Sequence, residues 1–217
     1  MTQHHTTTPV SIRYGGTHHS QRHPVAAAGF SLIEVLVSIV VLSFGLIGVV
    51  GMQAAALQAN RESRAQSSAA ALIRELAETI RANKAEGVKP APNNPYLGSF
   101  SSPLVATTPS YCLNVASTTP CAGATDIANA QMTEWLARVD AELSGARVVL
   151  CFDSAPYDAN GLPRWACDDA GNIMVIKFSW THGSTDRSKT GTNALERATD
   201  DSSRPLIVLP VTAGSST

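Results

Sequence analysis

The sequence is poor in charge, and this scarcity excludes some classes of function. Charged residues make up 15% and aromatic residues 6% of the 217 positions, and 16 Lys and Arg stand against 17 Asp and Glu. The absence of a basic surplus argues against a nucleic-acid-binding protein, whose binding surface would carry one. Hydrophobic residues, at 44%, are near the globular average, which argues against disorder throughout the chain.

Acidic residues are absent before Glu34. Residues 1–29 hold two Arg, five of the six His and many Thr, Ser and Gly, without a helical or strand period. This composition predicts an unstructured polar segment. A metal site at the His pairs is the alternative, but no Cys or acid accompanies them.

Residues 30–52 read FSLIEVLVSIVVLSFGLIGVVGM, and Glu34 is the only charge among them. A helix of about 20 apolar residues crosses the hydrocarbon core of a bilayer, which is about 30 Å thick. The Arg residues before the run, and the lack of acids there, place that end in the cytoplasm. The chain from about Gln53 onward is then expected outside the cytoplasm.

Three interpretations of this apolar run compete. A secretory signal peptide would have a shorter apolar region of about 7–15 residues before its cleavage site. Ala54-Ala55-Ala56 lies on the right side for such a site, but the run is too long. A plain membrane anchor explains the length and the orientation, but not an acid in the hydrocarbon layer, which is costly and tends to be functional.

The third interpretation rests on a motif. The segment Gly29-Phe30-Ser31-Leu32-Ile33-Glu34 resembles the class III prepilin signal of the type IV filament family. The resemblance implies that prepilin peptidase cuts after Gly29 and methylates the new amine of Phe30. It also implies that Glu34 acts in assembly by pairing with the N-terminal amine of a neighbouring subunit. A buried carboxylate requires a cation, and that amine is one.

Residues 34–48, 51–54 and 80–83 are similar to the minor pilins called PilV, the type IV pilus modification proteins. Leaders in this family are usually short, whereas this one has 29 residues and its nearest base is Arg22. The resemblance implies a non-enzymatic subunit without cofactors, which takes part in pilus assembly, in the initiation or tip complex. Its partners would be prepilin peptidase, other minor pilins, the major pilin and the inner membrane.

Two alternatives to a minor pilin remain. One is a pseudopilin of type II secretion. The other is a membrane-anchored periplasmic enzyme, whose Ser-His-Asp or Cys-His site would depend on His182, the only His after residue 29. A surface His in a turn is the simpler interpretation.

A group of acids in the C-terminal half is a candidate cation site. Asp153, Asp158, Asp168 and Asp169 could gather around calcium, but the twelve-residue loop typical of calcium sites is missing, so acids in turns are expected.

The helix is predicted to continue beyond the membrane. Residues 53–86 contain no Pro or Gly, and apolar residues recur at helical spacing. They are Leu57, Ala65, Ala69, Leu72, Leu76 and Ile80. We therefore expect one helix from Phe30 to about Ala85, ended by Gly87, with Arg74 and Glu78 paired across one turn.

Glycines recur every third residue in the membrane half, at Gly45, Gly48 and Gly51. This spacing indicates either close helix packing or local melting within a filament. Ordinary tolerance of Gly in membrane helices is the alternative.

The sequence predicts four segments: a cytoplasmic leader (1–29) that is removed, a transmembrane helix (30–52), its amphipathic continuation (53–86) and a periplasmic globular domain (87–217). In the last, a helix is expected from Thr125 or Asp126 to Leu143, with loops over 87–109 and 184–204. Strands are expected at 146–152, 172–180 and 205–211, the last at a sheet edge because of its prolines. The fold class is α+β and pilin-like: a long N-terminal transmembrane helix packed on a small antiparallel sheet, with one extra helix.

All four cysteines lie in the globular part, at Cys112, Cys121, Cys151 and Cys167. An even number in an exported domain predicts disulfides. Three pairings are possible, of which the nearest-neighbour one joins Cys112 to Cys121 and Cys151 to Cys167. A zinc site is the alternative, but no C-x-x-C spacing occurs.

Overall fold

The computed structural model describes residues 29–186 and 188–214. These residues form two compact units, one up to Val50 and one from Gly51 onward. Helix α1 (Leu32–Ala82) begins in the first unit and continues in the second. The predicted leader, apart from Gly29, lies outside the described residues.

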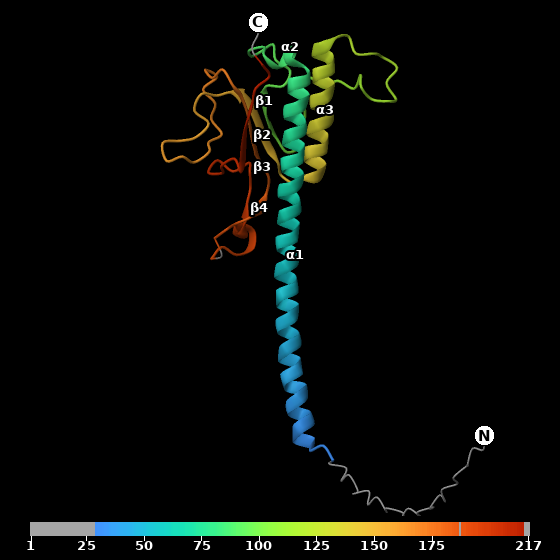
Figure 1. The fold of residues 1–217 in the computed structure, drawn as a ribbon, viewed down its shortest axis with the longest axis vertical. Helices are drawn as coiled ribbons and strands as arrows, with labels where there is room; N and C mark the ends of the chain where they lie inside the picture. The colour runs from blue at the N-terminus through green and yellow to red at the C-terminus, as the bar shows by residue number, and fades with distance from the viewer. Residues whose placement is uncertain (1–28, 187, 215–217) are drawn as a thin grey trace, which may run out of the picture. The chain divides into compact units, whose positions relative to one another are not determined.

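The second unit combines helices with a small sheet, as Figure 1 shows. The elements after α1 are α2 (Lys84–Gly87), β1 (Gly98–Ser101), α3 (Ala124–Glu142), β2 (Arg147–Phe152), β3 (Met174–Ser179), β4 (His182–Gly183), a 3-10 helix η1 (Gly191–Ala194), β5 (Leu195–Glu196) and β6 (Ile207–Val211). The predicted α+β, pilin-like architecture of a long apolar N-terminal helix, a small antiparallel sheet and further helices is confirmed.

The main sheet has the strand order β1-β2-β3-β6, and every pair in it is antiparallel. Val148 of β2 stands opposite Phe178 of β3, and Ile176 of β3 stands opposite Leu209 of β6. Strand β6 therefore lies at an edge, as its prolines predict. Strands β4 and β5 form a separate two-stranded pair.

Helices α1 and α3 lie side by side on one face of this sheet (Figure 1). The Trp135 indole of α3 donates a hydrogen bond to the Leu72 carbonyl of α1 over 2.8 Å. The same ring meets Phe178 of β3 in an edge-to-face arrangement, with centroids 6.4 Å apart. This buried cluster packs α3 against both α1 and the sheet, and it uses the side chains of the strands that point toward one face.

The apolar stripe predicted on α1 is buried over its last four members but not at its start. Ala69, Leu72, Leu76 and Ile80 are all buried, and Ala65 packs partly against them. Leu57 is 61% exposed, because the sheet and α3 do not reach that turn of the helix.

The other face of the two central strands, β2 and β3, is buried as well, under the segment between them. Lys177, at the centre of β3, is fully buried and donates to the Ala166 carbonyl of this segment. The Arg147 guanidinium lies over the Trp165 ring, 4.4 Å from its centroid. Strand β3 is therefore buried on both faces, which explains its nearly continuous apolar sequence.

Three local expectations about the helices and loops are corrected. The helix breaks at Asn83, whose backbone (φ −107°, ψ 56°) is not helical, and α2 follows it. Glu78 pairs with Arg81 rather than with Arg74. A strand, β1, lies in the proline-rich stretch expected to be a loop, because a short extended stretch can pair with β2 between prolines.

Candidate functional site

The peptide bond between Gly29 and Phe30 lies just before α1. Both residues are exposed, and a Cβ added at Gly29 would meet no atom within 4 Å among the described residues. Helix α1 begins two residues after Phe30, at Leu32. The bond is therefore in accessible chain outside the helix, which is the state in which a peptidase can bind a substrate.

Glu34 lies in the first turn of α1. The Ser31 carbonyl accepts hydrogen bonds from the backbone N–H groups of Glu34 (3.0 Å) and Val35 (3.3 Å), which begins the helix. An acid in the first turn is favoured by the positive end of the helix dipole. Glu34 is exposed, and no ion pair joins its carboxylate to a cation within residues 29–186 and 188–214.

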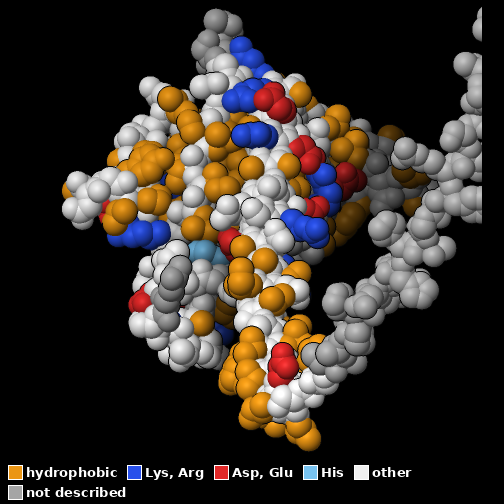
Figure 2. Space-filling model, turned by 60° about the horizontal axis from the view of Figure 1, so that its bottom comes forward, with side chains coloured by type: hydrophobic (Ala, Val, Ile, Leu, Met, Phe, Trp, Pro, Cys, Tyr) orange, Lys and Arg blue, Asp and Glu red, His pale blue; other side chains and the backbone are white. Residues whose placement is uncertain are grey.

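The residues that follow Glu34 form an apolar surface without cover. All the side chains from residue 29 to residue 60 are exposed, and the helix is long and apolar enough to cross a membrane. Figure 2 shows hydrophobic side chains crowded along this part of α1, with very little charge between them. Such a surface requires lipid or other apolar helices around it.

Two serine hydroxyls within this apolar stretch are satisfied inside the helix. The Ser38 hydroxyl donates to the Glu34 carbonyl and the Ser43 hydroxyl donates to the Ile39 carbonyl, each over 2.7 Å. This pattern suits a helix in lipid, where an unpaired hydroxyl is costly. Gly45, Gly48 and Gly51 have open space where a Cβ would stand, so nothing in the described part of the chain requires glycine there.

The four cysteines form two disulfides in the structure. Cys112 is bonded to Cys121 and Cys151 to Cys167, with Cα–Cα distances of 4.9 Å and 6.4 Å. This is the nearest-neighbour pairing. The first disulfide closes a loop before α3, and the second ties β2 to the segment that covers the outer face of the sheet.

His182 lies in a strand rather than in the expected turn, and its side chain is only 14% exposed. Its Nε2 is 3.6 Å from Oε2 of Glu196. The nearby Ser184 hydroxyl donates to Oε1 of Glu196 over 2.7 Å. Because that hydroxyl bonds to the carboxylate, these three side chains do not form the Ser–His contact of a nucleophilic site.

Three of the four acids that could have gathered around calcium have protein partners of their own. Asp153 pairs with Lys177, and Asp158 accepts from Arg204 and from the N–H groups of its own turn. Asp168 accepts from the hydroxyl and the backbone N–H of Ser154, and these two hydrogen bonds hold the pKa of Asp168 far below its usual range. These carboxylates therefore fix loops, as acids in turns do.

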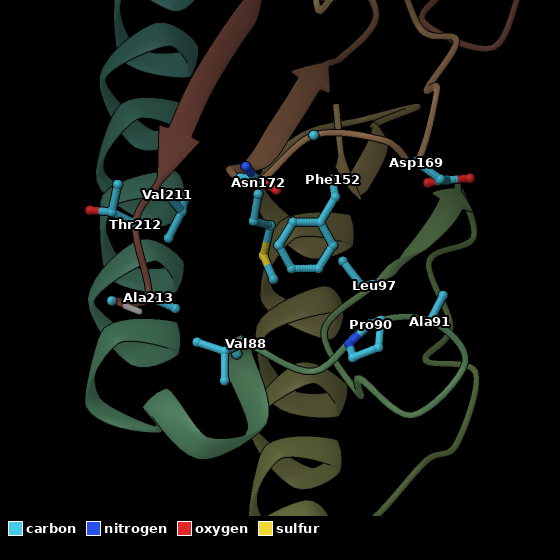
Figure 3. A pocket seen from close by; sticks show the side chains of 14 residues that line it. Val88, Pro90, Ala91, Leu97, Phe152, Asp169, Asn172, Val211, Thr212 and Ala213 are labelled. Atoms are coloured by element: carbon cyan, nitrogen blue, oxygen red, sulfur yellow. The ribbon is translucent and has the colours of Figure 1, made fainter. Parts of the chain in front are cut away.

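The structure also contains a cavity that the sequence does not predict. It has a volume of about 800 Å³ and is open at one end of the sheet, where Val88, Leu97 and Phe152 lie around it (Figure 3). Its lining is mostly apolar, and Asp169 is the one acid among the lining residues. Its walls come from segments far apart in the sequence, so no local signal could have found it.

One family of known proteins matches the N-terminal segment of the chain. The family described as the prokaryotic N-terminal methylation motif matches residues 26–50. No curated protein and no solved structure matches the chain significantly. The motif, followed by a long apolar helix and a small antiparallel sheet, fits a type IV pilin-like protein or a pseudopilin.

Proposed function

We propose that this pilin-like chain is a minor pilin of the PilV kind, which acts in the initiation or tip complex of a type IV pilus. Prepilin peptidase removes residues 1–29 on the cytoplasmic side and methylates Phe30. The helix over residues 30–52 holds the chain in the inner membrane, with residues 87–217 in the periplasm. The chain then leaves the membrane and joins other minor pilins and the major pilin in the pilus at the cell surface.

One observation carries the proposal. Glu34 has no cation partner among the described residues, yet it stands at the start of a helix whose apolar side chains are exposed. A carboxylate in an apolar layer is stable only beside a cation that shares the layer. The freshly cut and methylated amine of a neighbouring subunit has the right charge and depth. Glu34 gains this cation only when the subunits are assembled, so the pairing favours assembly. It requires no catalysis by the chain itself.

The mass of the mature N-terminal peptide tests the processing step. We expect a peptide that begins with N-methylated Phe30. A chain that retains Met1 would contradict the proposal.

The variant Glu34→Ala tests the assembly step. We expect normal membrane insertion and cleavage, but loss of the chain from sheared filaments. Glu78→Ala is the matched control, because Glu78 is an exposed acid on the same helix that pairs within the chain. Normal incorporation of Glu34→Ala would refute the role of Glu34.

A pseudopilin of type II secretion is a second candidate, because the methylation motif at residues 26–50 fits a pseudopilin as well as a pilin. Deletion of the gene separates the two functions. Loss of pili with normal protein secretion supports the minor pilin, whereas loss of secretion with normal pili supports the pseudopilin.

A further inference from the structure

A long stretch of the globular unit carries no charge at all. From Pro90 to Thr125, 36 consecutive residues include no Asp, Glu, Lys, Arg or His. Charged residues make up 15% of the whole chain, so their complete absence from this stretch is a clear local depletion of charge. Much of it lies at the surface, where charged side chains are normally common.

The most exposed part of this stretch is the disulfide-closed segment 111–121, which we name the cysteine loop. It projects from the N-terminal end of α3 (Figure 1). Tyr111, Leu113 and Val115 are 65%, 43% and 103% exposed. Three large apolar side chains within five residues, in a loop that itself contains no charged residue, form an apolar protrusion of the kind found at contact sites.

The cysteine loop is held in place at both ends. Besides the disulfide, the Ser110 hydroxyl donates to Oδ1 of Asp126 over 2.6 Å, and the Ala122 N–H donates to Oδ2 of the same carboxylate over 3.0 Å. Within the loop, the Asn114 side chain accepts from the Ala116 N–H over 3.0 Å. A protrusion ordered in this way loses little conformational entropy when it binds.

We propose that the cysteine loop inserts Tyr111, Leu113 and Val115 into an uncharged, apolar groove on a different protein subunit of the same filament. This inference rests on the proposed function. The lack of charge selects the partner, because a charged surface facing the loop would lose its hydration without gaining an opposite charge. The aliphatic tip at Val115 favours an apolar groove over a polysaccharide, whose hydroxyls require hydrogen-bonding groups.

A second copy of this chain is a poorer partner. Its cavity beside Phe152 is apolar, but Asp169 stands among the lining residues, and the loop offers no cation to that carboxylate. That cavity therefore does not offer the uncharged groove that the cysteine loop requires.

Photo-cross-linking in cells that assemble the filament tests this inference on the full chain. A photoreactive phenylalanine analogue replaces Val115. In the matched control it replaces Leu162, which is also an exposed apolar residue but lies outside the loop. We expect a discrete cross-link from position 115 to another subunit, mapped by mass spectrometry to an apolar stretch without charges, and none from position 162.

A charged variant provides the second arm. With the probe at position 115, Leu113→Asp should lower the yield of the cross-link about tenfold, because it would place an unpaired carboxylate in an apolar contact. Leu162→Asp should leave the yield unchanged.

Three results would overturn the inference: a yield from position 115 no higher than from position 162, a cross-link to a second copy or a polysaccharide, or an unchanged yield in Leu113→Asp. If the chain is processed to methylated Phe30 and is present in filaments, such a result counts against the loop alone. If the N-terminus is uncut and the chain is missing from filaments, the proposed function fails with it.

Discussion

Nζ of Lys177 lies 2.5 Å from Oδ2 of Asp153, and both side chains are fully buried. The ammonium group also donates to the Ala166 carbonyl over 2.5 Å. Asp153 accepts a further hydrogen bond from the Ala155 N–H over 3.0 Å. The pair thus joins the centre of β3 to the start of the segment that covers the sheet, and the hydrogen bond to Ala166 joins it to the interior of that segment.

Removal of one partner of this pair should destabilise the globular unit strongly. We expect Asp153→Ala to lower the free energy of unfolding by about 3–5 kcal/mol, because it leaves the Lys177 ammonium buried without an opposite charge. Glu75→Ala, which breaks the half-exposed pair with Arg138, should cost less than about 1 kcal/mol. Denaturant unfolding of the full chain in detergent micelles measures both, and equal losses would contradict the prediction.

The disulfide Cys151–Cys167 should contribute more stability than Cys112–Cys121. Its sequence separation is 16 residues against 9, and the cost of closing a loop in the unfolded chain grows with loop length. Loss of either should cost about 3 kcal/mol in the entropic account. The loss should be larger for Cys151→Ala with Cys167→Ala, because that bond also holds the cover over Lys177.

Thermal unfolding of the two double variants compares them. A larger loss on removal of Cys112–Cys121 would contradict the predicted order.

The anchoring of the cysteine loop should depend on pH in acid. Hydrogen bonds from the Ser110 hydroxyl and then the Ala122 N–H hold the pKa of Asp126 below its usual 3.8. Asp126 therefore binds a proton less readily in the folded chain than in the unfolded chain. The stability that its ionised carboxylate contributes is complete above about pH 3.8 and is lost as the pH falls through the folded pKa. Hydrogen exchange of the Ala122 amide should accelerate, relative to its intrinsic rate, as the pH falls below about 3.8.

Asp126→Asn is the control for this effect. It removes the titrating group, so the protection of Ala122 should be lower and no longer change in acid. Persistent acid-dependent loss of protection in Asp126→Asn would assign the effect to another group.

Gly171 should tolerate no side chain. A Cβ at this position would stand 2.5 Å from the backbone carbon of Asp153, which cannot move without disturbing the buried pair. We expect Gly171→Ala to destabilise the chain by about 1–3 kcal/mol through overpacking. Gly123→Ala, where a Cβ would meet nothing within 4 Å, should change stability by much less. Unfolding of both variants in one denaturant series tests the difference.

Periodicity predicted the elements that have a local signal. The helix α1, the helix α3 and the strands β2, β3 and β6 follow from apolar spacing and turn residues. Strand β1 did not, because its sequence GSFS contains one apolar residue, and its extended form depends on hydrogen bonds to β2 about fifty residues later. Such pairing is set by tertiary structure and leaves no mark on a window of a few residues.

The functional residues also divide into those with a local sequence signal and those that tertiary structure brings together. Gly29, Phe30 and Glu34 lie within six consecutive residues and form a motif, so the sequence alone identifies them. The burial of Lys177 does not follow from the sequence, since a single Lys in an apolar strand is equally consistent with an exposed edge. Its partner Asp153 lies 24 residues away and meets it only once β2 and β3 are paired.

The glycines of the membrane half offer a test that separates packing from flexibility. A Cβ at Gly45, Gly48 or Gly51 would meet nothing within 4 Å in the described chain, and Ala stabilises a helix by about 1 kcal/mol relative to Gly. Any loss of incorporation into filaments on substitution must therefore arise from neighbouring helices or from a need of the helix to bend.

If close packing is the reason, Gly48→Leu should remove most of the chain from sheared filaments, while Gly48→Ala removes little. Equal losses in both variants would indicate local melting, and no loss in either would indicate ordinary tolerance of glycine. Immunoblots of filament and membrane fractions measure how the chain divides between the two. We expect the loss in Gly48→Leu alone, because the three glycines recur at helical spacing within the uncovered apolar surface.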